Sequence, residues 1–219
     1  MKERGIIFNA EMVRAILDGR KTMTRRVMKV QPSPDFSPMN MGLETDFTAR
    51  WYTPGVVDKH GYLQPAKKQV FGVASEDEGY TCPFGAVGDR LWVRETWAEA
   101  GASAPDLKLY RANYPEHVPA HYENVPPAEE IRWTPSIHMP RWASRITLEI
   151  TGVRVERLAS ISDEDAGKEG YPANPAPFGG RLDKWLWFRQ LWDGIYPEQS
   201  FKHNPWVWVV EFRVIENRT

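Results

Sequence analysis

Two long stretches of this chain, at about residues 32–83 and 101–139, lack the hydrophobic periodicity that marks helices and strands. Both are rich in proline, and the first also carries several glycines and an acidic run at 76–78. We interpret them as two irregular insertions within a single domain spanning residues 1–219. The regular elements must then come from the segments before, between and after them.

The first segment predicts a strand over residues 4–9, followed by a helix with Asn9 as its N-cap and Gly19 as a left-handed C-cap. A second strand is predicted over residues 22–30. Three of its side chains would share one face: Thr24, Arg26 and Met28.

The later segments add further elements with the same kinds of signal. Apolar residues alternate over 144–158, and Ser162 is a good N-cap for a short acidic helix over 163–168. The remaining predicted elements are strands over 90–97 and 206–215 and an amphipathic helix over 182–192. Together they indicate an α+β fold, a small β-barrel or curled sheet of five to six strands with two or three flanking helices.

The composition is that of an ordinary folded protein, with 42% hydrophobic and 26% charged residues in 219. The single cysteine, Cys82, cannot form an intrachain disulfide, which favours a reducing compartment. The apolar run near the start, residues 6–8, is far shorter than a signal peptide or a membrane span. We therefore expect a cytoplasmic protein with no membrane partner.

Positive charge gathers in the first 30 residues, which hold eight Lys or Arg against three acids, although the net charge of the whole chain is −1. Such a patch suits a small anionic ligand or a few nucleotides, whereas a long nucleic-acid footprint needs a larger excess.

Four cations lie between Arg20 and Arg26, directly after the predicted helix. The simplest interpretation is a solvated face. A functional interpretation is that the neighbouring arginines lower the pKa of Lys21, so that a neutral amine can take a proton from Thr24 or from a water. In an ideal strand Lys21 and Thr24 point to opposite faces, so a shared site requires the chain to turn between residues 19 and 22.

The stretch from Ala15 to Arg26 resembles the signature of the ASCH family, Gly-x-Lys-x-x-(Glu or Thr)-x-Arg, whose domain is similar to the PUA-like RNA-binding fold. Two further segments are similar to the family's second and closing strands, residues 87–93 and 208–212. The irregular stretches resemble those of longer phage and prophage members. Four residues fill the motif: Gly19, Lys21, Thr24 and Arg26.

The threonine version of the motif resembles small bacterial N4-acetylcytidine amidohydrolases, in which a lysine, a threonine and a later glutamate are the proposed catalytic set. Aligning residues 161–169 with the family's acidic helix places that glutamate at Glu169, with Glu164 and Glu95 as competitors. A solvated loop acid is the alternative interpretation of Glu169.

The resemblance implies an amidohydrolase that removes an acyl group from N4 of cytosine or cytidine, without metal or cofactor. Lys21 would be the base, Thr24 the nucleophile or water positioner, and Glu169 the acid or base. Arg26 or a backbone N–H would face the oxyanion. The expected partner is a modified nucleoside or nucleobase, and possibly RNA. The alternatives are an RNA- or nucleotide-binding module without catalysis and a single-strand ribonuclease.

Substrate-binding candidates outside the motif come from segments that border the second irregular stretch. Trp97 and Trp142 are candidates for base stacking, and His138 and Arg141 precede a strand, a common place for binding groups. The alternative for the segment around Arg141 is that it docks an insertion. Pro119 argues against a helical zinc pair made by the two histidines that flank it. Tryptophans elsewhere are expected in the core: Trp185, Trp192 and Trp208.

Overall fold

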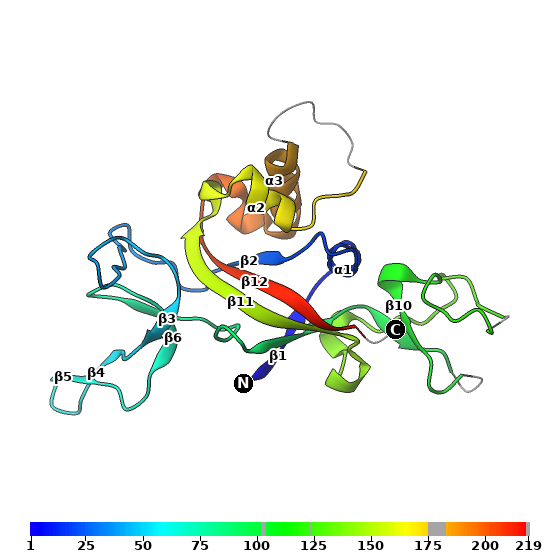
Figure 1. Ribbon diagram of the computed structural model, residues 1–219, viewed down its shortest axis with the longest axis horizontal. Helices are drawn as coiled ribbons and strands as arrows, with labels where there is room; N and C mark the ends of the chain where they lie inside the picture. Colours follow the sequence, from blue (N-terminus) through cyan, green and yellow to red (C-terminus); the bar gives the residue numbers. More distant parts are fainter. Residues whose placement is uncertain (102–103, 123, 175–182, 218–219) are drawn as a thin grey trace.

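A five-stranded sheet with the strand order β1-β8-β11-β12-β2 forms the centre of the protein (Figure 1). The computed structural model describes residues 1–101, 104–122, 124–174 and 183–217. β1 runs parallel to β8, and the other neighbours are antiparallel. The bounds are β1 Glu3–Ile7, β2 Met23–Val27, β8 Arg90–Arg94, β11 Ile146–Arg157 and β12 Trp206–Asn217.

The predicted α+β class is confirmed, but the predicted small barrel is not. Within the described residues, β1 and β2 are the two edges of the sheet and no strand pairing joins them. A side chain links these edges instead, because Arg26 Nη2 on β2 donates to the carbonyl of Ile7 at 2.7 Å. The sheet is therefore open.

Two of the α-helices begin where the capping signals predict. α1 (Ala10–Leu17) has Asn9 as its N-cap, and α2 (Asp163–Lys168) has Ser162, whose hydroxyl accepts from the backbone N–H of Asp165 at 3.0 Å. α3 (Asp183–Ile195) confirms the amphipathic helix, whose first predicted residue, Leu182, lies outside the described residues. In the part of the chain that the structure describes, no helix is both long and apolar enough to cross a bilayer.

Over residues 206–210, β12 is buried on both faces, and it divides the core into two layers. Trp208, Val210 and Phe212 face the layer shared with β1, β8 and α1, whereas Val207 and Val209 face α2 and α3. Its neighbour β11 contains register shifts, one of them between Ile150 and Gly152. This bulge keeps the apolar residues on one face when their positions change from even to odd numbers.

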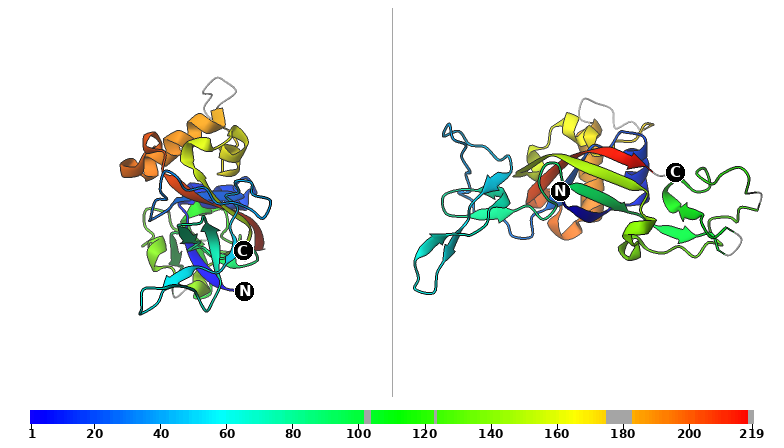
Figure 2. Two further views of the ribbon diagram at one scale, coloured as in Figure 1. Left: turned by 90° about the vertical axis from the view of Figure 1, so that its left-hand side faces the viewer. Right: turned by 60° about the horizontal axis from the view of Figure 1, so that its bottom comes forward.

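The two stretches predicted to be irregular contain short strands, and they extend from opposite sides of the central sheet (Figure 2). Strands of three to five residues are too short to give a periodic signal. The first stretch holds β3 Arg50–Tyr52, β4 Gly55–Val57, β5 Leu63–Pro65, β6 Val70–Ala74 and β7 Gly79–Thr81. Strand β10 (Lys108–Tyr110) of the second pairs with β9 (Trp97–Glu99).

Short 3-10 helices, labelled η, connect these elements. Their bounds are η1 Arg111–Asn113, η2 Ser136–His138, η3 Arg141–Ala143, η4 Leu158–Ser160, η5 Pro197–Gln199 and η6 Phe201–His203.

Candidate functional site

The chain turns sharply between α1 and β2, at the place that a shared site for Lys21 and Thr24 requires. Gly19 has a left-handed φ of +72°. The backbone N–H groups of Arg20 and Lys21 then both donate to the carbonyl of Ala15, at 2.8 and 2.9 Å. The turn directs Lys21 toward the end of α2, where it forms an isolated antiparallel bridge with Glu169.

Lys21 and Glu169, which are 148 residues apart in the sequence, are in direct contact. Lys21 Nζ donates to Glu169 Oε2 at 2.7 Å and to the carbonyl oxygen of the same residue at 2.8 Å. The Lys21 side chain is fully buried, and that of Glu169 is 3% exposed. A neutral amine has two N–H groups, so both would be used here and its lone pair would remain free for a proton.

Burial is the largest influence on the Lys21 amine and lowers its pKa. The Glu169 carboxylate opposes this shift, whereas Arg26 and Arg25 add to it. The direction agrees with the sequence prediction, but the main cause is burial rather than neighbouring cations. Arg20 instead pairs with Asp18 at 2.7 Å.

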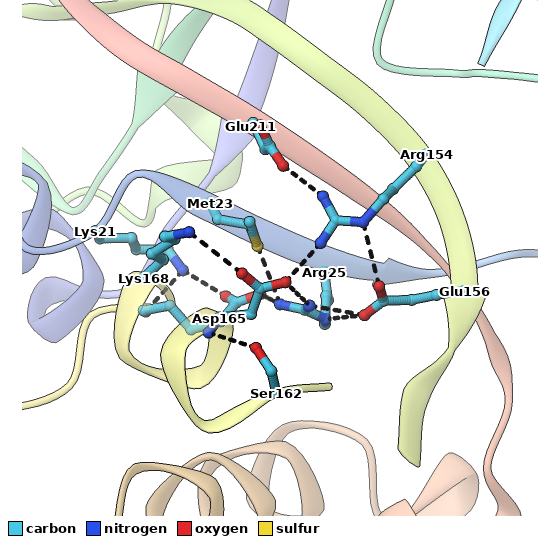
Figure 3. A network of polar contacts seen from close by, with 10 residues as sticks. Lys21, Met23, Arg25, Arg154, Glu156, Ser162, Asp165, Lys168 and Glu211 are labelled. Atoms are coloured by element: carbon cyan, nitrogen blue, oxygen red, sulfur yellow. Dashed lines mark hydrogen bonds and ion pairs between the residues drawn. The ribbon is translucent and has the colours of Figure 1, made fainter. Parts of the chain in front are cut away.

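Arg25 is a second buried cation that shares the Glu169 carboxylate. It donates to Glu169 Oε1 at 3.1 Å, to Glu156 at 2.7 Å and to Asp165 at 3.2 Å (Figure 3). Arg154 also pairs with Asp165, at 2.6 Å. Because Arg25 neutralises part of the Glu169 charge, less of it remains to hold a proton on Lys21.

This network is not predicted from the sequence. The one local signal for it is that Arg25 shares a strand face with the apolar Met23, because a charged side chain on a buried face needs acidic partners. Those acids lie 131 to 144 residues further along the chain. Spacing in the sequence carried no information about them.

Thr24 faces the opposite side of β2 from Arg25. It lies directly across from Val210 of β12 and is 2% exposed. Lys21 Nζ and Arg26 Cζ lie 5.6 and 5.3 Å from the centroid of the Phe8 ring. Phe8 and Val210 belong to the same core layer, so Thr24 and Arg26 face this layer, and the Lys21 amine also lies near its Phe8 ring. Lys21 precedes β2 and reaches Glu169, whose other oxygen binds Arg25 from the opposite face.

Of the three candidate acids, Glu169 is the one that contacts Lys21. Glu164 is a solvated helix residue whose side chain is 80% exposed and pairs with Lys168 at 3.0 Å. Glu95 is buried but pairs with Arg145, at 2.9 Å.

A cavity of about 330 Å³ lies beside this cluster, between α1 and α3. Glu169 and Gly170 form part of its wall, so Glu169 connects the buried amine with the cavity. The wall also contains Arg14, Arg20 and Trp187, together with the acidic Glu11 and apolar residues.

The remaining predicted binding residues lie elsewhere. Trp97 is 7% exposed and packs in a core cluster, so its ring is not open to a base, whereas Trp142 is 58% exposed. His138 is exposed on η2, and Arg141 pairs with Glu3 at 3.0 Å. In the interactions of the described residues, none of these four side chains touches Lys21, Thr24 or Glu169.

Neither a search for metal-ligand clusters nor a comparison with known proteins assigns a role to this site. Across the described residues, no three side chains of His, Cys, Asp or Glu are grouped so that they could hold a metal ion. The whole chain matches no protein-family model, no curated protein and no solved structure.

Proposed function

We propose that this protein is an amidohydrolase that removes an acyl group from N4 of a cytosine or cytidine derivative, on an ASCH-type, PUA-like domain. One observation carries the proposal: a fully buried lysine amine, Lys21, is held by Glu169 at the start of β2, the strand that bears Thr24 and Arg26. The residues that fill the ASCH motif support the same assignment.

In the proposed reaction the neutral amine of Lys21 takes a proton from the Thr24 hydroxyl or from a water that Thr24 holds. The oxygen attacks the acyl carbon, and the oxyanion that forms faces Arg26 or a backbone N–H. The bond between the acyl carbon and N4 then breaks, and Glu169 transfers the proton from Lys21 to the departing cytosine. Where Thr24 itself attacks, the acyl group remains as an ester on its oxygen, and a water that gives a proton to Lys21 then hydrolyses this ester and restores the hydroxyl. By either route, net addition of one water yields a carboxylic acid and a free exocyclic amine.

The wild-type protein should therefore convert N4-acetylcytidine, followed by ultraviolet absorbance. Lys21→Met should lower turnover by about a hundredfold or more, because proton transfer by a positioned base contributes about 10²- to 10⁴-fold. Thr24→Val keeps the branched shape on β2 but removes the hydroxyl, and should cause a loss of similar size. Lys29→Met, which changes an exposed lysine just after β2, is the matched control and should retain activity.

A nucleic-acid-binding module without catalysis is the second candidate, because Arg14 and Arg20 line the cavity beside Glu169. Salt-sensitive binding of an oligonucleotide, combined with no conversion of N4-acetylcytidine at high protein concentration, would favour this module. Cleavage of single-stranded RNA in the same assay would favour a ribonuclease.

A further inference from the structure

A second buried ion pair lies outside the Lys21 cluster, where β8 and the start of β11 meet the second insertion. Arg145 contacts both oxygens of Glu95, at 2.9 and 3.0 Å, and Asn113 Oδ1 at 2.9 Å. Its guanidinium carbon lies 4.0 Å from the centroid of the Tyr110 ring. The side chain is 3% exposed, so these contacts fix its plane and position.

These bonds use Nε and Nη2 of Arg145, and no hydrogen bond of Nη1 is found among the described residues. Arg145 lines a cavity of about 240 Å³, together with Lys108, Trp142 and Ser144. Nη1 therefore keeps donor capacity at this cavity that an acceptor on a ligand can use.

Two other polar groups of this cavity have partners within the protein. Ser144 donates its hydroxyl hydrogen to the carbonyl of Val93 at 2.7 Å, and His117 Nε2 accepts from the backbone N–H of Tyr110 at 3.1 Å. Glu95 balances the charge of Arg145. Lys108 and Asp106, which also line the cavity, carry opposite charges. The cavity therefore lacks the concentrated positive charge of a phosphate site and offers the Arg145 donor beside aromatic rings.

Trp142 supplies an exposed aromatic ring at this cavity, and the flexible Lys108 side chain places its Nζ 5.6 Å from the ring centroid. The Trp142 side chain is 58% exposed, and Trp97 supports it from behind with perpendicular rings whose centroids are 5.3 Å apart. A volume of 240 Å³ is below the roughly 300–1,000 Å³ of drug-sized ligand sites, and suits a single planar ring system.

We propose that this cavity is a nucleobase-binding site, in which the base stacks on Trp142 and its acceptor edge receives a hydrogen bond from Arg145 Nη1. Guanine fits best, because O6 and N7 form an acceptor edge, whereas adenine presents an amino group at that edge. Stacking on an exposed aromatic ring is the usual way in which proteins hold unpaired bases.

The base can come from a free nucleotide or from a nucleotide of a single strand. Arg14, which lines the cavity beside Glu169, donates to the carbonyl of Ala112 at 2.7 Å. The next residue, Asn113, holds Arg145. One contact between α1 and η1 thus lies between the two cavities, and a short single-stranded oligonucleotide could occupy both. The proposal for the second cavity does not depend on chemistry at Lys21.

Isothermal titration calorimetry on the full chain tests this site with four probes: guanosine monophosphate, adenosine monophosphate, ribose 5-phosphate and a single-stranded guanosine-containing pentanucleotide. We expect guanosine monophosphate to bind more tightly than adenosine monophosphate, and ribose 5-phosphate not to bind. Trp142→Ala should weaken binding about tenfold or more. Trp51→Ala is the matched control, because Trp51 is 57% exposed on β3, and should bind as the wild type does.

If the pentanucleotide binds more tightly than the mononucleotide, the base comes from single-stranded nucleic acid. Equal binding of the two identifies a free nucleotide as the source. Arg145→Lys retains the charge opposite Glu95 but removes the fixed Nη1 donor, and should abolish the preference for guanosine. Ribose 5-phosphate binding as tightly as the nucleotides, or wild-type affinity in Trp142→Ala, would overturn the proposal. Absence of binding for every probe at millimolar concentration would do the same.

Discussion

At the scale of single residues, the state of Lys21 depends on a carboxylate that it shares with Arg25. Each carboxylate oxygen of Glu169 accepts a hydrogen bond from one of these cations, from Lys21 at 2.7 Å and from Arg25 at 3.1 Å. Arg25 therefore acts on Lys21 in two ways, by repulsion and by neutralising Glu169. Both effects favour the neutral amine.

Replacing Arg25 by glutamine should raise the pKa of Lys21, and the acidic limb of the rate–pH profile should move to higher pH. The variant should also lose about 3–5 kcal/mol of stability, because buried carboxylates lose their partner. Arg25→Lys keeps the charge and should leave the limb near that of the wild type. Arg213→Gln removes an exposed arginine and should not move it. An unmoved limb in Arg25→Gln would contradict the assignment of Lys21 as the base.

The lowered pKa of Lys21 also predicts how stability depends on pH. Between the folded-state pKa and the ordinary value of 10.5, the unfolded chain binds more protons than the folded one at this residue. The free energy of unfolding from this group therefore rises with pH across that window. Urea unfolding between pH 7 and 9.5 should show a smaller rise for Lys21→Met than for the wild type, and identical slopes would contradict the expectation.

At the scale of elements, the junction of α1, β2 and the end of α2 depends on one close approach. Gly170 has a φ of +106°, and a Cβ at this position would lie 2.9 Å from the Cβ of Ala15 and 3.3 Å from that of Lys21. The absence of a side chain at Gly170 therefore allows Glu169 to reach Lys21.

Gly170→Ala should destabilise the protein by about 2 kcal/mol or more, from the positive φ and the crowding together. It should also reduce turnover, since Lys21 and Glu169 would be pushed apart. Gly194→Ala is the control, because a Cβ there meets no atom within 4 Å in α3, and it should stabilise by a few tenths of a kcal/mol to about 1 kcal/mol. Thermal unfolding and the N4-acetylcytidine assay measure both effects, and wild-type behaviour of Gly170→Ala would refute them.

At the scale of the whole molecule, the central sheet carries the Lys21 cluster, and the first insertion joins it through a few buried side chains. Phe71 and Val73 of β6 belong to the main core, whereas β4 and β5 are exposed along their whole length and pair with each other. We therefore expect the tip of this insertion to be dispensable for folding.

Replacing residues 54–68 by Asn-Gly should leave the Tm within a few degrees of the wild-type value, because the β3–β6 pairing between Tyr52 and Val70 can close through a two-residue turn. Turnover of N4-acetylcytidine should also be unchanged. Calorimetry and the absorbance assay check the two expectations. Loss of activity in a well-folded variant would show that the β4–β5 hairpin takes part in function.

Local signals were sufficient for several elements of this protein. Asn9, Ser162 and Gly19 were predicted as caps because a short polar side chain or a left-handed residue acts on its own helix end. Alternation likewise predicts β11, and a strand is also predicted over residues 206–215, where β12 lies. The sequence does not predict the short strands of the insertions, since strands of three to five residues show no clear period. The expectation that Trp97 is open to a base is wrong, because the burial of Trp97 depends on the distant Met139 and Ala143.

The sequence by itself determined where the main helices and strands of the central domain form, because caps and hydrophobic periods act over a few residues. Tertiary structure alone decided that the sheet stays open between β1 and β2, and that Lys21 and Arg25 share Glu169. These contacts join residues more than 140 positions apart, and their geometry depends on the packing of α2 against the edge of β2. Local chain preferences depend only on residues a few positions apart, so they cannot specify contacts of this range.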